Sequence, residues 1–206
     1  YIGRSVFPQE LEGQQIGAYL LVTLDAGSQD ELDNMLEQMA ELVLDAGAMD
    51  VLVADTPAKI KDAWAARSSF LEAIMHETKL LDECDVVVPV NKIADYLDFV
   101  NKTGEDCGLV IKSFGHAGDG NLHIYQCSND LEEEEFKSRV DKFFEIIYRE
   151  ATNCGGLVSG EHGIGSGKIK YLVDSVGETN MALMEGIKRV FDPKMILNPG
   201  KVCYRL

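Results

Sequence analysis

The chain has 206 residues, of which 46% are hydrophobic and 26% charged, as is typical of a folded globular protein. Its 19 Lys and Arg residues against 35 Asp and Glu residues give a formal net charge of −16. This acidic balance argues against binding to nucleic acid or to an anionic membrane surface, because both partners require a basic surface.

The cysteines and the apolar runs narrow the class of protein further. Five cysteines are scattered without a C-x-x-C pair, which favours reduced thiols over disulfides or a thiolate zinc site. No apolar run reaches the roughly 18 residues that a membrane helix needs. Because the first residue is Tyr1 rather than Met, we expect a processed chain or a fragment of a longer protein. The expected location is cytoplasmic, with any membrane contact made through partner subunits.

Strands and helices alternate at the start of the chain. The apolar residues 18–26 predict a strand, and a capping box at 28–31 begins a helix. Residues 49–54 predict a second strand. Pro57 then opens a further helix, which carries Arg67.

A hairpin is predicted in the middle of the chain. An apolar strand over 85–90 is followed by a helix from Asn91 to Gly104, and strands over 109–114 and 122–127 flank a tight turn. Early alternation together with a central hairpin predicts an α+β fold. We expect a ferredoxin-like arrangement, with a largely antiparallel sheet covered by helices on one side.

The last part of the chain is predicted to be helical. An acidic run at 132–135 begins a long helix by complementing the helix dipole. The glycine-rich residues 154–167 lead into a helical pair that stops at Asp192, before a proline. We therefore assign 1–155 to a ferredoxin-like substrate or cap domain, and 156–206 to a glycine-rich active-site loop and helical tail of the same unit.

Two histidines flank the predicted hairpin turn. Asp119-Gly120 is a strong signal for a two-residue turn, and this register places His116 directly opposite His123. Opposed residues have Cβ atoms about 4.5–5.5 Å apart, which suits two imidazoles that share a metal ion. A stacked or hydrogen-bonded pair fits the same spacing. The prediction depends on the register, because a longer loop would change the pairing.

The segment Ser159-Gly160-Glu161-His162-Gly163 lies among further glycines, which allow the backbone to approach a ligand closely. Glu161 can supply the third ligand of a His-His-carboxylate site that keeps a coordination position open. His162 beside such a metal suits a general base, since histidine changes its charge near neutral pH. A flexible connecting loop with a glutamate at a helix start explains the same residues.

Three segments together resemble the C-terminal domain of FAD-linked oxidases, in the vanillyl-alcohol oxidase superfamily. They are GHAGDGNLH at 115–123, SGEHGIG at 159–165 and FDPKMILNPGK at 191–201. This group includes glycolate oxidase D subunits, D-lactate dehydrogenases and D-2-hydroxyglutarate dehydrogenases. The resemblance extends over nearly the whole chain, and three motifs in this order are much more specific than one.

The resemblance implies a flavoenzyme that oxidises a 2-hydroxy acid to a 2-oxo acid. An N-terminal domain, which we expect to be absent from this chain, would hold the FAD, so the chain alone is expected to be inactive. By position, His116, His123 and Glu161 correspond to ligands of a divalent metal such as zinc. His162 corresponds to the catalytic base.

The resemblance also implies roles for residues outside the two histidine motifs. Arg67 corresponds to an arginine that binds the substrate carboxylate, which a guanidinium can do through two parallel hydrogen bonds. Asn198 and Lys201 fall where the tail returns to the flavin domain, which implies a contact with the cofactor. A redox partner protein or subunit is a further expected partner.

Two positions depart from the D-2-hydroxyglutarate branch. Tyr125 stands where that branch has an asparagine, and Glu83 stands where it has a lysine for a second substrate carboxylate. Because Glu83 would repel that carboxylate, we expect a small monocarboxylate such as lactate or glycolate.

Two other functions are compatible with part of the pattern. A non-catalytic metal- or ligand-binding regulatory module on the same fold would explain the hairpin histidines, but neither His162 nor the tail. A zinc hydrolase, in which the open metal position activates water, would need no flavin domain.

Overall fold

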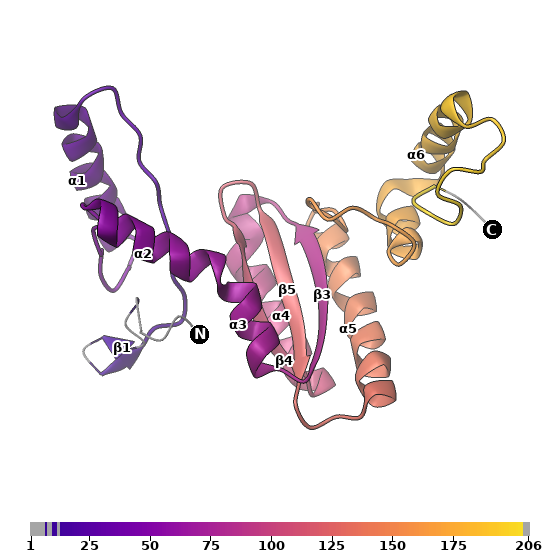
Figure 1. Cartoon of the computed structure of the whole chain (residues 1–206), viewed down its shortest axis with the longest axis horizontal. Coiled ribbons are helices and arrows are strands. Elements are labelled where there is room, and N and C mark those ends of the chain that lie inside the picture. The colour runs from indigo at the N-terminus through magenta and orange to yellow at the C-terminus, as the bar shows by residue number, and fades with distance from the viewer. Residues whose placement is uncertain (1–6, 8–9, 12, 204–206) are drawn as a thin grey trace. The chain divides into compact units, whose positions relative to one another are not determined.

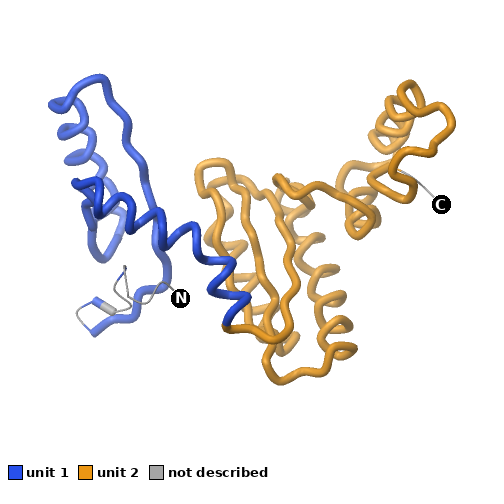
Figure 2. The backbone as a smooth tube through the Cα atoms, viewed as in Figure 1, with its two compact units in different colours: residues 1–76 blue, residues 77–206 orange. Residues whose placement is uncertain are grey.

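The computed structural model describes residues 7, 10–11 and 13–203 and divides the chain into two compact units, Tyr1–His76 and Glu77–Leu206 (Figure 2). The predicted boundary at 155 lies inside the second unit, and the separate role of 156–206 stays a prediction. No helix in the described part of the chain is both long and apolar enough to cross a membrane.

The first unit is mainly helical (Figure 1). Ser28 Oγ accepts a hydrogen bond from the Glu31 N–H at 3.2 Å, as the capping box predicts. Thr56 caps the next helix in the same way, accepting from the Lys59 N–H at 3.3 Å. The elements are β1 (Glu10–Leu11), β2 (Gln14–Gln15), α1 (Gln29–Asp45), α2 (Pro57–Ser68) and α3 (Phe70–Glu77), the last of which reaches the unit boundary.

The strands predicted over 18–26 and 49–54 are wrong. Neither segment joins a β-ladder within the described residues. Their apolar side chains stay accessible, with Leu20 67% and Leu52 61% exposed. An apolar run only favours a strand, whereas a strand exists when a neighbouring strand accepts and donates its backbone hydrogen bonds.

The elements of the second unit before its C-terminal helix are β3 (Leu80–Val87), a 3-10 turn η1 (Val90–Lys92), α4 (Ile93–Cys107), β4 (Val110–His116), β5 (Asn121–Ser128) and α5 (Glu133–Asn153). Its three strands form an antiparallel sheet in the order β3-β5-β4. The helices α4 and α5 pack on one face of this sheet (Figure 1). The order strand, helix, hairpin, helix, with the last strand between the other two, is that of the split βαβ motif of ferredoxin-like folds. The predicted α+β fold is therefore confirmed.

A single bridge continues the sheet beyond β3. Val87 and Leu157 exchange two backbone hydrogen bonds of 3.0 and 2.8 Å in antiparallel orientation. Leu157 thus stands at the edge where a ferredoxin-like sheet has its fourth strand. This bridge brings the glycine-rich segment that follows it onto the sheet.

The core lies between the sheet and its two helices. Buried apolar side chains of the strands pack against those of α4 and α5, and the Tyr96 hydroxyl donates to the Ile147 carbonyl at 2.8 Å. Because side chains alternate along a strand, the neighbouring residues point to the opposite face. The central members of the core are Val86, Val100, Leu122, Ile124, Phe143 and Ile147.

Two predicted boundaries change. The strand predicted over 85–90 begins earlier, at Leu80, and ends at Val87, because it pairs with β5 along its whole length. The predicted end of α4 at Gly104 is also wrong. The helix continues to Cys107 and ends at Gly108, whose φ of 65° is left-handed.

The helical pair predicted near the C-terminus is confirmed. It is α6 (Ile169–Phe191), in which Gly177 interrupts the helix with φ 76° and ψ 166°. The helix stops at Asp192, as predicted from the proline that follows. The Asp192 carboxylate accepts hydrogen bonds from the Lys188 ammonium and from the backbone N–H groups of Ile196 and Leu197, and these bonds lower its pKa.

Candidate metal and active site

The candidate site lies on the sheet face opposite the core. In the register of the sheet, His123 on β5 lies opposite Asp85 on β3 and Phe114 on β4. Tyr125 lies opposite Glu83 in the same way. Alternation along each strand therefore places these side chains on one face, while Cys84, Val86, Leu122 and Ile124 between them belong to the core.

The predicted pairing of His116 with His123 is wrong by two residues. His116 pairs with Asn121, and a four-residue loop replaces the two-residue turn. The Gly120 N–H donates to the His116 carbonyl at 3.0 Å, and a Cβ on Gly120 would lie 2.0 Å from the Val88 carbonyl oxygen. A glycine is therefore needed at this position both for the turn and for the close approach of the Val88 backbone.

The two histidines still share a face. A shift by an even number of residues leaves each side chain on its original side of the sheet. His116 and His123 are diagonal neighbours, and their ring centroids lie 6.1 Å apart. The predicted proximity is thus retained with a different register.

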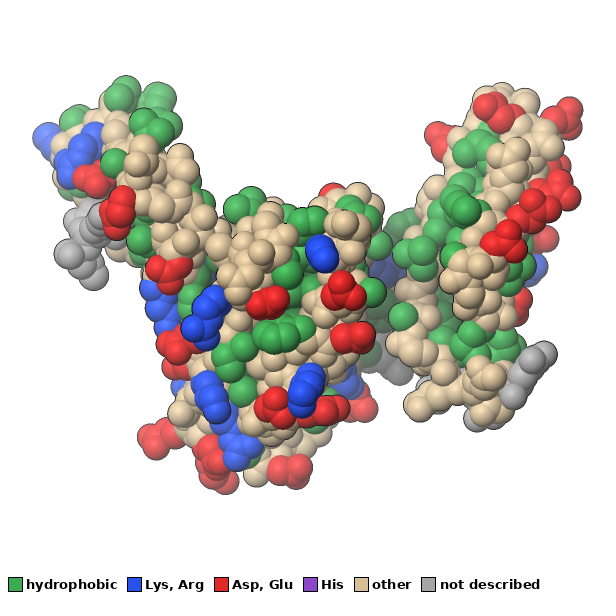
Figure 3. Space-filling view, turned by 180° about the vertical axis from the view of Figure 1, so that it is seen from behind, with side chains coloured by type: hydrophobic (Ala, Val, Ile, Leu, Met, Phe, Trp, Pro, Cys, Tyr) green, Lys and Arg blue, Asp and Glu red, His purple; other side chains and the backbone are tan. Residues whose placement is uncertain are grey.

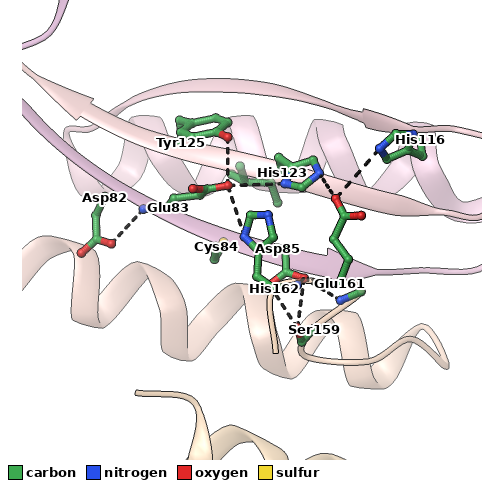
Figure 4. A network of polar contacts seen from close by, with 12 residues as sticks. Asp82, Glu83, Cys84, Asp85, His116, His123, Tyr125, Ser159, Glu161 and His162 are labelled. Atoms are coloured by element: carbon green, nitrogen blue, oxygen red, sulfur yellow. Dashed lines mark hydrogen bonds and ion pairs between the residues drawn. The ribbon is translucent and has the colours of Figure 1, made fainter. Parts of the chain in front are cut away.

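Residues 159–163, the Gly-Glu-His loop, lie over this face, and the side chains of Glu161 and His162 point in different directions (Figure 4). Glu161 Oε1 lies 2.8 Å from His123 Nε2 and 3.9 Å from His116 Nε2. The His162 ring lies beside the His123 ring, with centroids 4.7 Å apart. The structure therefore brings together all four residues that the two motifs predicted.

Glu83 forms a second polar contact point beside these residues. Its Oε1 accepts a hydrogen bond from the Tyr125 hydroxyl at 2.9 Å. The same oxygen lies 3.4 Å from His123 Nδ1 and 3.4 Å from His162 Nδ1. One carboxylate thus faces a predicted metal ligand and the predicted base at once (Figure 4).

The donor set fits a divalent metal. The ligand atoms of His116, His123 and Glu161 all lie within 4.8 Å of one another. Two ligands bound at about 2.0–2.1 Å to one tetrahedral ion lie about 3.3 Å apart, between the two distances to Glu161 given above. Two nitrogens and one oxygen also leave a fourth position open.

The buried side of His123 supports the same assignment. Its Nδ1 is buried, and no hydrogen bond to it occurs among the described residues. Metal-bound histidines commonly direct their second nitrogen to a carboxylate, and Glu83 is the carboxylate in that direction. Glu83, His123 and His162 form an alternative donor set that shares His123 with the first.

Three predicted residues lie away from this cluster or in the other unit. Arg67 lies in α2 of the first unit, where its guanidinium is 5.7 Å from the Phe70 ring centroid. Asn198 and Lys201 lie after α6, and Asn198 has a left-handed φ of 45°. Within residues 77–203, no hydrogen bond or ion pair joins Asn198 or Lys201 to the cluster. Their roles stay predictions.

Asp85 is the residue that the sequence reasoning missed. Its carboxylate is fully buried and accepts hydrogen bonds from the Gly-Glu-His loop. Burial raises the pKa of Asp85, but the Lys168 ammonium and the loop amides lower it more, so the net pKa lies well below its ordinary value. An aspartate at the start of the apolar run DVVVPV was the available signal, because a buried charge requires partners.

Comparison with known proteins identifies the family. A model of the C-terminal domain of FAD linked oxidases matches residues 5–202. The chain belongs to this family. It is 59% identical over its whole length to a D-lactate dehydrogenase of Anaerostipes hadrus and 35% identical to one of Archaeoglobus fulgidus. It is 33% identical over 187 residues, 90% of its length, to the glycolate oxidase subunit GlcD of Bacillus subtilis.

This FAD-linked oxidase domain covers only part of those relatives. It spans 43% of each of the two D-lactate dehydrogenases and 39% of the glycolate oxidase subunit. The predicted family is therefore confirmed. The activity of a whole protein that contains this domain stays a prediction.

Proposed function

We propose that the chain is the C-terminal, substrate- and metal-binding part of an FAD-dependent 2-hydroxyacid dehydrogenase of the D-lactate or glycolate type. The observation that carries this proposal is the convergence of His116, His123 and Glu161, with His162 beside them, on one face of the sheet. The names of the relatives support the class of reaction. An N-terminal FAD domain and a redox partner are the proposed partners.

Two bound groups would supply chemistry that side chains lack. When bound, the metal supplies a Lewis acid for the substrate oxygens and the flavin accepts a hydride. His116, His123 and Glu161 are the proposed ligands, with zinc as the proposed ion. We assign carboxylate binding to Arg67, and contact with the flavin side to Asn198 and Lys201.

The proposed base is His162. It would accept the proton of the substrate 2-hydroxyl as the 2-oxo acid forms. The Glu83 carboxylate, 3.4 Å from its Nδ1, stands where it can stabilise the protonated imidazole. The Tyr125 hydroxyl holds that carboxylate in place from the other side.

Glu83 also bears on the choice of substrate. Its negative charge lies beside His162, so a substrate with a second carboxylate near this position would meet charge repulsion. A small monocarboxylate avoids this cost. We therefore assign lactate or glycolate, rather than a dicarboxylate, as the substrate class.

Metal binding by the 206-residue chain tests the proposed ligands. We expect zinc to bind the wild-type chain with 1:1 stoichiometry in isothermal titration, and the His116→Ala, His123→Ala double variant to lose this binding. His76→Ala is the matched control, because His76 is an exposed histidine outside both motifs. Equal zinc binding by the double variant and the wild type would refute the ligand assignment.

The base is tested in the protein that also contains the flavin-binding part. We expect His162→Gln to lower kcat for D-lactate by about 10²–10⁴-fold, the usual contribution of a general base, with bound flavin retained. Unchanged kcat in a fully flavinated variant would exclude His162 as the base.

A further inference from the structure

A buried carboxylate lies beneath the loop that carries the proposed ligand and base. Asp85 is 0% exposed and faces residues 159–162 from β3 (Figure 4). Its Oδ2 accepts from the backbone N–H groups of Gly160 at 2.7 Å, Glu161 at 2.8 Å and His162 at 3.0 Å. The Ser159 hydroxyl donates to the same oxygen at 3.0 Å.

The other carboxylate oxygen has a charged partner. The Lys168 ammonium, from the residue that precedes α6, pairs with Asp85 Oδ1 and lies 3.4 Å from the Asp85 carbonyl oxygen. Both carboxylate oxygens therefore have hydrogen-bond partners in the loop or in the segment after it. Burying a charged carboxylate costs free energy unless it is paired and hydrogen-bonded. Loss of one of these partners should therefore disturb the conformation of the loop.

The hydrogen bonds determine the direction of two side chains. Three consecutive N–H groups that converge on one oxygen restrict the backbone of Gly160, Glu161 and His162 to a narrow range of conformations. With that backbone held, Glu161 points to His123 and His162 points to Glu83. The same loop conformation thus sets the ligand and the base together.

A second contact with the same sheet face limits the position of the loop. A Cβ on Gly160 would lie 2.2 Å from Asn121 Oδ1, so the loop approaches β5 as closely as a glycine allows. Ser159 Oγ additionally accepts the Gly163 N–H at 2.9 Å, which closes the loop on itself. Precise placement of ligands and bases in proteins usually depends on such supporting contacts.

We propose that Asp85 is a positioning residue that holds Glu161 and His162 in their working orientations, an inference that rests on the function proposed above. Among the described residues, Asp85 forms no side-chain hydrogen bond or ion pair with His116, His123 or Glu83. It acts through the backbone of the loop. Ser159 and Lys168, which lie before and after the loop residues 160–163, bind the same carboxylate.

The test measures loop order and zinc affinity in the 206-residue chain. In Asp85→Asn we expect faster hydrogen exchange at the amides of Gly160, Glu161 and His162, with exchange at Val86 and Ile124 unchanged. The dissociation constant for zinc should rise by about 10–100-fold, as it does on loss of supporting contacts at other metal sites. Asp82→Asn, an exposed aspartate on the same strand, is the matched control.

Ser159→Ala keeps the test decisive if Asp85→Asn does not fold, because it leaves the carboxylate in place and removes only the Ser159 hydroxyl, which donates to Asp85 and accepts from the Gly163 N–H. It should show a smaller change in the same two measurements. The proposal is overturned if the wild-type loop amides are unprotected, or if zinc affinity in the folded variants stays within about twofold of the wild type. If the wild-type chain binds no zinc, the metal assignment fails, while the exchange data still decide the role of Asp85.

Discussion

At the scale of single residues, the proposed substrate class depends on the charge of Glu83, which lies 3.4 Å from Nδ1 of the proposed base His162. In the flavin-containing protein, Glu83→Gln should raise kcat/KM for D-2-hydroxyglutarate relative to D-lactate by about tenfold, equivalent to removal of about 1.4 kcal/mol of charge repulsion. Glutamine keeps an acceptor for the Tyr125 hydroxyl, so the change removes charge more than shape. Steady-state kinetics with both substrates provide the measurement.

The Asp82→Asn variant serves as the control for this prediction too, since it removes an exposed charge from the neighbouring strand position. An unchanged ratio in Glu83→Gln would show that Glu83 does not face the substrate. Wild-type turnover of 2-hydroxyglutarate at a rate equal to or above that of D-lactate would also contradict the assignment.

The predicted site residues differ in how far the sequence could place them. His116 and His123 share a face in either register, because the predicted and observed pairings differ by an even number of residues. Glu161 and His162 are adjacent in sequence, and a glycine-rich loop allows many directions for them. In our proposal, Asp85 holds the loop in the observed conformation through hydrogen bonds to residues 74 to 77 positions further along the chain. No local sequence pattern predicts such a contact.

At the scale of elements, Gly104 shows how closely α4 packs on β4. A Cβ at this position would lie 2.2 Å from Ile111 Cγ1. We expect Gly104→Ala to lower the free energy of unfolding by about 1–2 kcal/mol, because overpacking of about 1–3 kcal/mol exceeds the gain in helix propensity of at most about 1 kcal/mol. Urea unfolding of both proteins gives this difference.

Gly186→Ala is the matched control, since this glycine lies within α6 and no atom lies within 4 Å of its added Cβ. This change should raise the free energy of unfolding by about 0.5–1 kcal/mol through helix propensity alone. Equal free energies of unfolding for the two alanine variants would contradict the prediction, because they would mean that the contact between α4 and β4 accommodates a Cβ at residue 104 without loss of stability.

The elements themselves were predictable where their signals are local. The helix α1 follows from its cap and apolar spacing, and α6 from its apolar face and its proline stop. The end of α4 was misplaced because a glycine can mark either a helix end or a close packing contact. Residues 18–26 and 49–54 were misassigned because strand pairing depends on distant partners.

At the scale of the whole molecule, charged and large apolar side chains are both exposed. Acidic side chains are visible on both units with basic ones interspersed, in agreement with the net charge of −16 (Figure 3). Large apolar side chains are also exposed near the end of α6, where Val190 is 76% and Phe191 is 82% exposed. Such exposed apolar groups are typical of surfaces that contact another protein part.

The proposed division of roles between this chain and an FAD domain leads to a prediction about the flavin. On the proposed function, the FAD is held by an N-terminal domain that these 206 residues do not include, so a polypeptide of these residues alone should bind no FAD. When the chain is joined to the flavin-binding part, hydrogen exchange over residues 183–197 should slow as the apolar side chains become covered. Zinc affinity should stay the same in both, since all proposed ligands lie on this chain. A yellow preparation of the 206 residues alone, with flavin absorbance that survives gel filtration, would contradict this division of roles.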